Sequence, residues 1–206
     1  MNTSASAIIK LGGSLFGVPD LASRLANFLR DFSRPRPILV CGGGPSVELI
    51  RNWDRIYNLG EEESHWLALR ILSINSRVVS RLLPELLTMV DSFEGCFPAW
   101  ERDLVPVYDS FQYMVEIDET SQDPLPRRWR VTSDTISARM AVTFGAPELI
   151  LLKSVTLPER VSLSAAAEEG WVDPHFPVAA RPIERIVSVN LRAAKLAESI
   201  FYDRAT

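Results

Sequence analysis

Short apolar runs alternate along this chain with longer segments in which apolar residues recur at helical spacing. The runs are typical of buried strands, and the spacing is typical of amphipathic helices. We expect strands at residues 7–11, 38–41, 85–90, 104–108, 129–132, 149–152 and 186–189. We expect helices at residues 20–32, 46–57, 61–83, 133–144 and 191–201, with a further short helix inside 159–169. Strands that alternate with helices in this way predict an α/β domain with a largely parallel sheet.

The polar stretch at residues 117–128 contains Pro124 and Pro126 and is predicted to be a loop. In sheets of parallel strands, ligands bind at the carboxyl ends of the strands. Four motifs of this chain follow expected strands at such ends, after residues 11, 41, 132 and 152. These motifs are therefore the first places to look for function.

Size and charge narrow the class of protein. The 206 residues, 47% of them hydrophobic, fit one domain spanning residues 1–206. The formal net charge of −4 argues against a protein that binds nucleic acid through its phosphates. The apolar runs are far shorter than a membrane span, and the polar residues 1–6 lack the features of a signal peptide. We therefore expect a cytoplasmic protein that binds neither membranes nor nucleic acids.

The cysteines and histidines do not predict a metal site. Cys41 and Cys96 are far apart, as are His65 and His175, and neither pair has metal-ligand spacing. Two cysteines also provide no disulfide framework, which suits a reducing compartment. No side chain is assigned to a metal.

Lys10, Gly12, Gly13 and Ser14 form the first motif, a turn directly after an expected strand. Adjacent glycines let the backbone approach a ligand and point N–H groups at an anion, and the lysine adds a mobile positive charge. The pattern indicates phosphate binding, although its spacing matches neither G-x-x-x-x-G-K-[ST] nor G-x-G-x-x-G. Taken alone, it is explained equally well by a tight strand-to-helix turn with a solvated lysine.

Gly42, Gly43 and Gly44, followed by Pro45, form a second glycine turn between a strand and a helix. Consecutive N–H groups at a helix N-terminus favour a phosphate or carboxylate, and proline suits the first helical turn. The alternative is a turn that only lets the helix pack on the sheet. Two such turns after two buried strands favour ligand binding.

Two polar motifs follow later in the chain. Ser133 and Asp134 open one expected helix, and Lys153 and Ser154 follow the strand expected at 149–152. An aspartate at a helix start is usually a cap, and a lysine at a strand end is often solvated. Both motifs are interpreted as functional only in the company of the two glycine turns.

In this order and separation, the four motifs resemble those of the amino acid kinase family, which includes aspartate, glutamate, carbamate and uridylate kinases. The resemblance covers nearly the whole chain. It implies a three-layer αβα sandwich around a mostly parallel sheet, with an acceptor-side half at residues 1–125 and a shortened nucleotide-side half at 126–206. It also implies ATP and Mg²⁺ as cofactors, a small anionic acceptor and a homo-oligomer.

The resemblance gives each motif a role. Lys10 and Asp134 would be catalytic, the lysine contacting the transferred phosphoryl group and the aspartate orienting the lysines around it. Such roles suit phosphoryl transfer, in which the protein mainly places groups and stabilises charge. The residues implied to bind the nucleotide are Gly12, Gly13, Ser14, Lys153 and Ser154. The residues implied to bind the acceptor are Gly42, Gly43, Gly44, His65 and Ser133.

The chain departs from the family pattern at two places. Where members have Thr-Asp-x-x-Gly, residues 153–157 read Lys-Ser-Val-Thr-Leu, and no Gly-Met-x-x-Lys segment supplies a second catalytic lysine. Lys153 or Lys195 would have to take its place. Lys195 lies in the helix expected at residues 191–201, where a solvated position is favoured.

A short branch of the family, the methanofuran-synthesis kinases, is similar to the chain in size and at residues 59–66 and 170–177. The first segment would place His65 at the acceptor, although a half-buried histidine with a local partner is the slightly favoured alternative. Asp173 and His175 in the second segment are interpreted as turn residues.

Two functions stay open. The first is an ATP-dependent kinase that phosphorylates a carboxylate or phosphate of a small acceptor, as in methanofuran- or methanopterin-linked one-carbon cofactor metabolism. The second is a member without catalysis that binds a nucleotide or anion as a sensor or an assembly subunit. The glycine turns with Lys10 and Asp134 favour the first function, and the missing second lysine motif favours the second.

Overall fold

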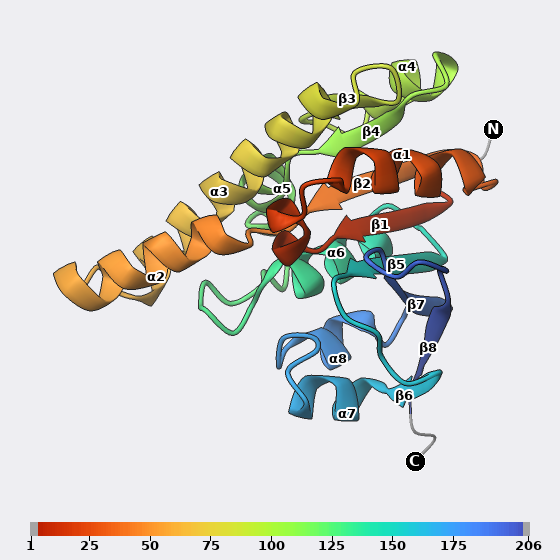
Figure 1. Cartoon of the computed structure of the whole chain (residues 1–206). Coiled ribbons are helices and arrows are strands. Elements are labelled where there is room, and N and C mark those ends of the chain that lie inside the picture. The colour runs from red at the N-terminus through yellow and green to blue at the C-terminus, as the bar shows by residue number, and fades with distance from the viewer. Residues whose placement is uncertain (1–3, 204–206) are drawn as a thin grey trace.

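The computed structural model describes residues 4–203, which form an eight-stranded sheet covered by helices (Figure 1). The strands are β1 (Ala7–Leu11), β2 (Pro37–Cys41), β3 (Leu87–Val90), β4 (Val105–Tyr108), β5 (Glu148–Lys153), β6 (Arg160–Ser162), β7 (Arg185–Asn190) and β8 (Glu198–Tyr202). Their order across the sheet is β3-β4-β2-β1-β5-β7-β8-β6. Within the described residues every strand pair is parallel except β7–β8. The predicted mostly parallel sheet is confirmed.

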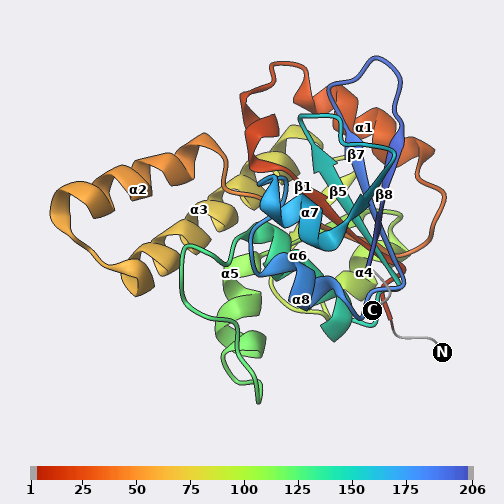
Figure 2. The same ribbon diagram turned by 90° about the horizontal axis from the view of Figure 1, so that it is seen from below.

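The helices are α1 (Leu21–Asp31), α2 (Pro45–Tyr57), α3 (Glu61–Leu82), α4 (Cys96–Glu101), α5 (Ser110–Tyr113), α6 (Ser133–Thr143), α7 (Leu163–Glu168) and α8 (Phe176–Ala180). A 3₁₀ turn, η1 (Gly13–Gly17), follows β1, and a π-helical turn, η2 (Met114–Asp118), follows α5. Helix α2 and the first half of α3 project beyond the sheet as a helical hairpin (Figures 1 and 2). The second half of α3 returns to the sheet.

The central strands are buried on both faces. In β1, Ile8 packs into one hydrophobic cluster and Ile9 into another. The cluster around Ile9 includes Leu25 and Leu29 of α1, whereas the cluster around Ile8 includes Ile136 of α6. Successive strand residues point to opposite faces of a sheet, so both faces of this sheet are covered. The predicted three-layer αβα sandwich is confirmed.

The sheet divides at its centre between strands from the first part of the chain and strands from the last part. Strands β1–β4 come from residues 1–125 and occupy one side, while β5–β8 come from residues 126–206 and occupy the other. The parallel pair β1–β5 joins the two sides. Both Lys10 and Lys153 lie on this central pair of strands.

Two expected elements are wrong. Residues 129–132 form a turn and an extended approach to α6 instead of a strand, because Thr132 is the N-cap of that helix. Residues 191–201 are not a helix, because turns precede β8, in which buried and exposed residues alternate as in a strand. The loop expected at 117–128 also starts late, since η2 extends to Asp118.

The remaining expected strands and helices match described elements, and their ends agree to within about two residues. Methods of assigning secondary structure differ from one another by a similar amount. The short helix expected inside 159–169 is α7, preceded by β6. Of the polar start at residues 1–6, residues 1–3 lie outside the described part. Among the residues that the structure describes, no helix is long and apolar enough to cross a membrane.

Candidate active site

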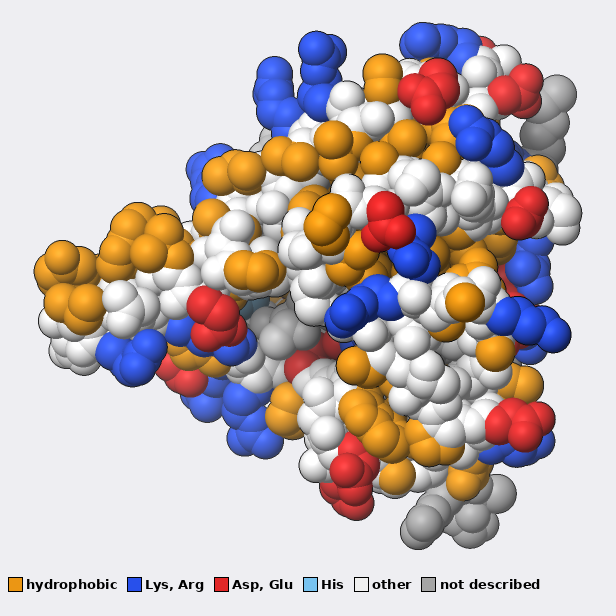
Figure 3. Space-filling model, viewed as in Figure 1, with side chains coloured by type: hydrophobic (Ala, Val, Ile, Leu, Met, Phe, Trp, Pro, Cys, Tyr) orange, Lys and Arg blue, Asp and Glu red, His pale blue; other side chains and the backbone are white. Residues whose placement is uncertain are grey.

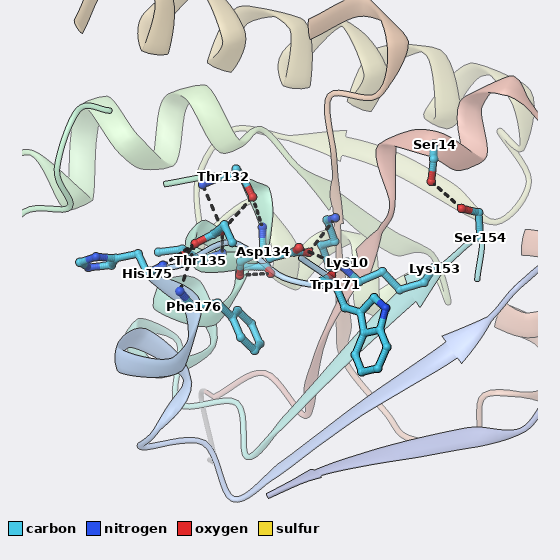
Figure 4. Close-up of polar contacts among 12 residues, drawn as sticks. Lys10, Ser14, Thr132, Asp134, Thr135, Lys153, Ser154, Trp171, His175 and Phe176 are labelled. Atoms are coloured by element: carbon cyan, nitrogen blue, oxygen red, sulfur yellow. Dashed lines mark hydrogen bonds and ion pairs between the residues drawn. The ribbon is translucent and has the colours of Figure 1, made fainter. Parts of the chain in front are cut away.

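A buried lysine and a second lysine that is largely buried share one buried carboxylate at the centre of the sheet. Lys10 lies in β1, Lys153 ends β5, and Asp134 lies in the first turn of α6. The Asp134 Oδ1 atom is 2.8 Å from Lys10 Nζ, and its Oδ2 atom is 2.8 Å from Lys153 Nζ (Figure 4). The structure thus brings together the two residues expected to be catalytic and one candidate for the second lysine.

The chain contains only three lysines, and two of them are in this cluster. The third, Lys195, is exposed in the turns before β8, so its expected helix is wrong although its expected exposure is confirmed. Lysines are rarely buried without a counter-charge. Placing two of three on one aspartate indicates a site for a ligand of negative charge.

The cluster shifts the protonation of its members. Burial by itself would raise the pKa of Asp134, but Lys10 and Lys153 outweigh burial and lower that pKa to about 2. Burial lowers the pKa of Lys153 from its ordinary 10.5, and Asp134 opposes that change. Asp134 is therefore ionised at neutral pH and holds both ammonium groups in place.

Asp173 fixes the start of α6, and with it Asp134. Its buried carboxylate accepts hydrogen bonds from the N–H and hydroxyl groups of Thr132 and Thr135, at 2.5–3.1 Å. It also accepts from the N–H groups of His175 and Phe176, both at 3.0 Å (Figure 4). Asp173 therefore closes the turn expected from the sequence, and it also anchors α6, which the sequence did not indicate.

The same segment positions the second lysine. The carbonyl of Trp171 accepts a hydrogen bond from Lys153 Nζ at 2.8 Å. Lys153 is thus held between Asp134 and residues 171–176, and Asp173 anchors both. The sequence does not indicate the contact between Trp171 and Lys153. The two residues are 18 positions apart and meet only because the chain folds back toward β5 after β6.

The two glycine turns lie directly against each other. A Cβ atom on Gly13 would lie 2.0 Å from Gly44 N, and one on Gly44 would lie 2.1 Å from the Gly13 carbonyl oxygen. Gly44 also has a φ of +61°, which glycine adopts at little cost. Neither position has room for a side chain, so the two turns form one continuous backbone surface.

Part of this surface is free to bind an anion. Gly12 and Gly42 donate their N–H groups to carbonyls at the ends of strands, both at 2.8 Å. These two N–H groups are therefore not available to a ligand. The N–H groups of Gly13, Gly43 and Gly44 have no partner within residues 4–203. Three unpaired N–H groups close together are suited to a phosphate.

Asn75 in α3 braces the second turn. Its buried side-chain amide donates to the carbonyls of Gly42 and Gly43, at 2.7 and 2.9 Å. Both carbonyls are thereby satisfied, and the turn is held in one orientation. Asn75 lies 32 residues from Gly43 within a helical pattern, so the sequence did not single it out.

A cavity of about 530 Å³ opens beside the two turns, bounded by α2, α3 and the start of α6. Figure 3 shows a hollow where the helical hairpin meets the body of the molecule. The apolar walls are Val47, Ala68, Leu69, Leu72, Val131 and Ile136. The expected site residues in the lining are Gly13, Ser14, Gly43, Gly44, His65 and Ser133. The expected site residues outside it are Lys10, Gly12, Gly42, Asp134, Lys153 and Ser154.

Arg51 and Trp129 also line the cavity, and neither was expected there. The Arg51 guanidinium lies over the Trp129 ring, 5.1 Å from its centroid, and bonds Glu48 at 2.8 Å. Arg51 lies about two turns after the start of α2, the helix that follows the second glycine turn. This position in the sequence could have indicated that Arg51 is near the turn. Glu48 also lines the cavity, so Arg51 contributes donor N–H groups to the wall and its charge is balanced there.

The opposite side of the cluster faces the turn after β5. The hydroxyls of Ser14 and Ser154 are hydrogen-bonded at 2.8 Å and join the first glycine turn to the end of β5 (Figure 4). Among residues 4–203, no group of three or more His, Cys, Asp and Glu residues is placed to hold a metal ion, and both Asp134 oxygens face lysines. The described residues of the cluster therefore do not by themselves build a Mg²⁺ site.

Comparison with known proteins identifies relatives by sequence. Residues 6–156 match the model of the amino acid kinase family. Over 149 residues the chain is 22% identical to the [5-(aminomethyl)furan-3-yl]methyl phosphate kinase of Methanocaldococcus jannaschii. That match covers 72% of this chain and 65% of the kinase, slightly less than two thirds of its length.

Comparison with solved structures identifies relatives by fold. The UMP kinase of Ureaplasma parvum has a TM-score of 0.66 at 11% identity, covering 97% of this chain and 99% of that one. The aspartate kinase of Synechocystis has a TM-score of 0.66 at 13% identity, covering 98% of this chain and 41% of that one. At these identities the similarity shows a shared fold.

Proposed function

The chain belongs to the amino acid kinase family, and from that premise we propose that it is an ATP-dependent kinase for a small anionic acceptor. The observation that carries the proposal is the pair of lysines, Lys10 and Lys153, on the single buried carboxylate of Asp134. Phosphoryl transfer needs groups held in place and charge stabilised at the moving phosphoryl. Two fixed ammonium groups beside unpaired backbone N–H groups supply both.

In this mechanism Lys10 and Lys153 contact the transferred phosphoryl group, and Asp134 orients them. Lys153 takes the place of the lysine that other members carry in a Gly-Met-x-x-Lys segment. The N–H of Gly13 binds the nucleotide side, and the N–H of Gly44 binds the anionic part of the acceptor. Because the two turns touch, donor and acceptor meet with little chain motion, which favours transfer by proximity.

We propose ATP as the donor, with Gly12, Ser14 and Ser154 beside its phosphates. Mg²⁺ would enter with the nucleotide and neutralise phosphate charge there. The protein's own part is to hold the lysines and exclude water around the reacting oxygens.

The acceptor that we propose is a phosphate on a small ring, as in the acceptor named for the Methanocaldococcus jannaschii kinase. The apolar walls of the cavity suit a ring, and Gly43, Gly44 and Arg51 suit a phosphate. Ser133 lies on the same wall. Such an acceptor would place the protein in methanofuran- or methanopterin-linked one-carbon metabolism, and a carboxylate acceptor is the alternative.

The experiment is phosphoryl transfer from ATP with Mg²⁺ to [5-(aminomethyl)furan-3-yl]methyl phosphate and to a panel of carboxylates, followed by ADP release. We expect acceptor-dependent ADP release, with kcat about 100- to 1,000-fold lower in Lys10→Met and in Lys153→Met. Lys195→Met is the matched control, since this lysine is exposed, and its rate is expected to equal that of the wild type.

Other outcomes separate the alternatives. ATP binding without transfer to any acceptor would support a sensor or assembly subunit and overturn the kinase proposal. A wild-type rate in Lys10→Met would remove the assigned role of that lysine. No nucleotide binding at millimolar ATP, measured by calorimetry, would contradict both functions.

We also propose a homo-oligomer that works in the cytoplasm. Exposed apolar side chains gather on α2 and on the second half of α3, and Figure 3 shows orange side chains along these helices. They are Leu49, Trp53, Ile56 and Tyr57 of α2 and Ile74, Val78 and Leu82 of α3. Helix α3 begins with three glutamates and ends with Arg77 and Arg81, so two antiparallel copies would bring opposite charges together.

The buried free thiols of Cys41 and Cys96 suit a reducing compartment.

A further inference from the structure

One asparagine of α3 holds two peptide groups of the second glycine turn. Asn75 is only 6% exposed, and its side-chain amide donates to the carbonyls of Gly42 and Gly43, at 2.7 and 2.9 Å. Because both partners are carbonyl oxygens, only the NH₂ end of the amide can face them. What the side chain contacts therefore fixes its orientation.

Each of these two carbonyls belongs to the same peptide group as an N–H of the turn. The Gly42 carbonyl shares its group with the Gly43 N–H, and the Gly43 carbonyl shares its group with the Gly44 N–H. No peptide bond within residues 4–203 is cis, and in a planar trans peptide the C=O and N–H bonds point in opposite directions. Asn75 therefore turns the N–H groups of Gly43 and Gly44 away from itself.

The two N–H groups belong to the lining of the cavity. Gly43 and Gly44 line it, whereas Asn75 does not. Leu72, one turn earlier on α3, lies against Gly43 and also lines the cavity. Within the described chain neither glycine N–H has a partner. One buried side chain thus directs two unpaired donors to the same side, at a surface that a ligand can reach.

Glycine makes this control necessary. Residues without a Cβ atom let the adjoining peptide groups turn over at little cost, and Gly44 already has a φ of +61°. If either peptide group turned over, a carbonyl oxygen would replace an N–H at the cavity and would repel an anion. The hydrogen bonds from Asn75 favour the orientation that binds anions. They also polarise both peptide groups, which strengthens their N–H donors.

We propose that Asn75 is a positioning residue for the anionic group of the acceptor, which it does not itself touch. It selects the orientation of the turn in which Gly43 and Gly44 both donate to that group. The inference rests on the kinase function proposed above, because that function supplies the acceptor. The anion site itself can be measured without phosphoryl transfer.

The first experiment titrates the full chain, labelled with ¹⁵N-glycine, with inorganic phosphate at constant ionic strength. The chain has only ten glycines, so each amide resonance can be followed separately. In the wild type we expect the Gly43 and Gly44 resonances to shift with phosphate. Gly170 is the internal control, because a Cβ atom there would meet nothing within 4 Å, and its resonance should not move. No shift at Gly43 and Gly44 would overturn the proposal.

A variant assigns the response to Asn75. Asn75→Leu keeps the branched shape of the side chain and removes both donors. We expect the Kd of phosphate, read at Gly43 and Gly44, to rise at least about tenfold. Asn52→Leu is the matched control, because Asn52 is an exposed asparagine of α2, and its Kd should equal that of the wild type. A wild-type Kd in Asn75→Leu would contradict the assignment.

Two comparisons separate positioning from a general loss of structure. Gly13 belongs to the other glycine turn and its peptide group is not held by Asn75, so its response to phosphate should be kept. Asn75→Gln retains the amide and is expected to recover part of the response at Gly43 and Gly44. Equal weakening at all three glycines would overturn the proposal. If Asn75→Leu does not fold, Asn75→Ala makes the same comparison.

Kinetics measure the same role in the kinase reaction. For an acceptor of the panel above that supports transfer, Asn75→Leu is expected to raise the acceptor KM at least about tenfold and to leave the KM for ATP unchanged. No transfer to any acceptor would overturn the kinase, and the phosphate titration would still decide the anion site. Transfer with an unchanged acceptor KM would leave the kinase and overturn the role of Asn75.

Discussion

Asp134 is the residue on which both buried lysines depend. Asp134→Asn keeps the shape of the side chain but leaves two buried ammonium groups without their carboxylate. Breaking a buried ion pair in this way costs about 3–5 kcal/mol of stability. Urea unfolding at pH 7 measures the loss. Asp20→Asn removes an exposed pair with Arg24 and serves as the control, with an expected change below about 1 kcal/mol.

The same carboxylate predicts how stability depends on pH. The pKa of Asp134 is about 2 in the folded chain, below its ordinary 3.8. Its contribution is therefore complete above pH 4 and is lost as pH falls from 4 toward 2, by about 2 kcal/mol. Urea unfolding of the wild type and of Asp134→Asn at a series of pH values isolates the contribution of Asp134 to the free energy of unfolding. Parallel acid curves for the two proteins would show that Asp134 does not titrate as described.

Charged residues next to the end of a strand or the start of a helix could be identified from the sequence. Lys10, Asp134 and Lys153 each lie at such a position, so the short segments around them were enough to make them candidates. Asp173 was identified only as a turn residue and Asn75 not at all, because the groups that they anchor lie 38–41 and 32–33 residues away. What they hold is decided by tertiary folding, which local spacing does not encode.

At the scale of elements, the two glycine turns act as one unit. Gly13→Ala would place a methyl group 2.0 Å from backbone atoms of Gly44, which no side-chain motion can relieve. We expect a loss of at least about 2 kcal/mol in urea unfolding and a large loss of phosphoryl transfer. Gly17→Ala is the matched control, since a Cβ there meets nothing within 4 Å, and its stability should change by less than about 1 kcal/mol. Equal effects of the two substitutions would refute the close contact.

The errors in element assignment have a common cause. Residues 191–201 contain good helix formers such as Ala194 and Leu196, yet β7 offers an edge that Glu198–Tyr202 pairs with. Pairing with an existing strand outweighs local propensity. At residues 129–132, Thr132 is used as a helix cap and is not available for a strand. Segments such as α3 were predictable because their apolar residues recur at helical spacing, so that one face of the helix is apolar and becomes buried.

At the scale of the whole molecule, the exposed apolar side chains of α2 and α3 predict assembly. Val78→Asp places a charge within the exposed apolar face of α3, and it is expected to convert a dimer to a monomer. Sedimentation velocity at micromolar concentration measures the change. Val178→Asp in α8 is the control, because Val178 is also exposed but does not lie on α2 or α3. A monomeric wild type would refute the interface.

The ammonium groups outnumber the carboxylate that they share. Lys10 and Lys153 both pair with Asp134, and the other carboxylate that acts on Lys153, that of Asp173, is occupied by hydrogen bonds to Thr132, Thr135 and the backbone of residues 175 and 176. An anion placed beside the two ammonium groups would be attracted to them. We therefore expect inorganic phosphate to stabilise the folded chain and to raise its melting temperature as its concentration rises. For the proposed kinase, the consequence is that one anion would replace another at the lysines, so that release of the product and arrival of the next nucleotide would be coupled through charge.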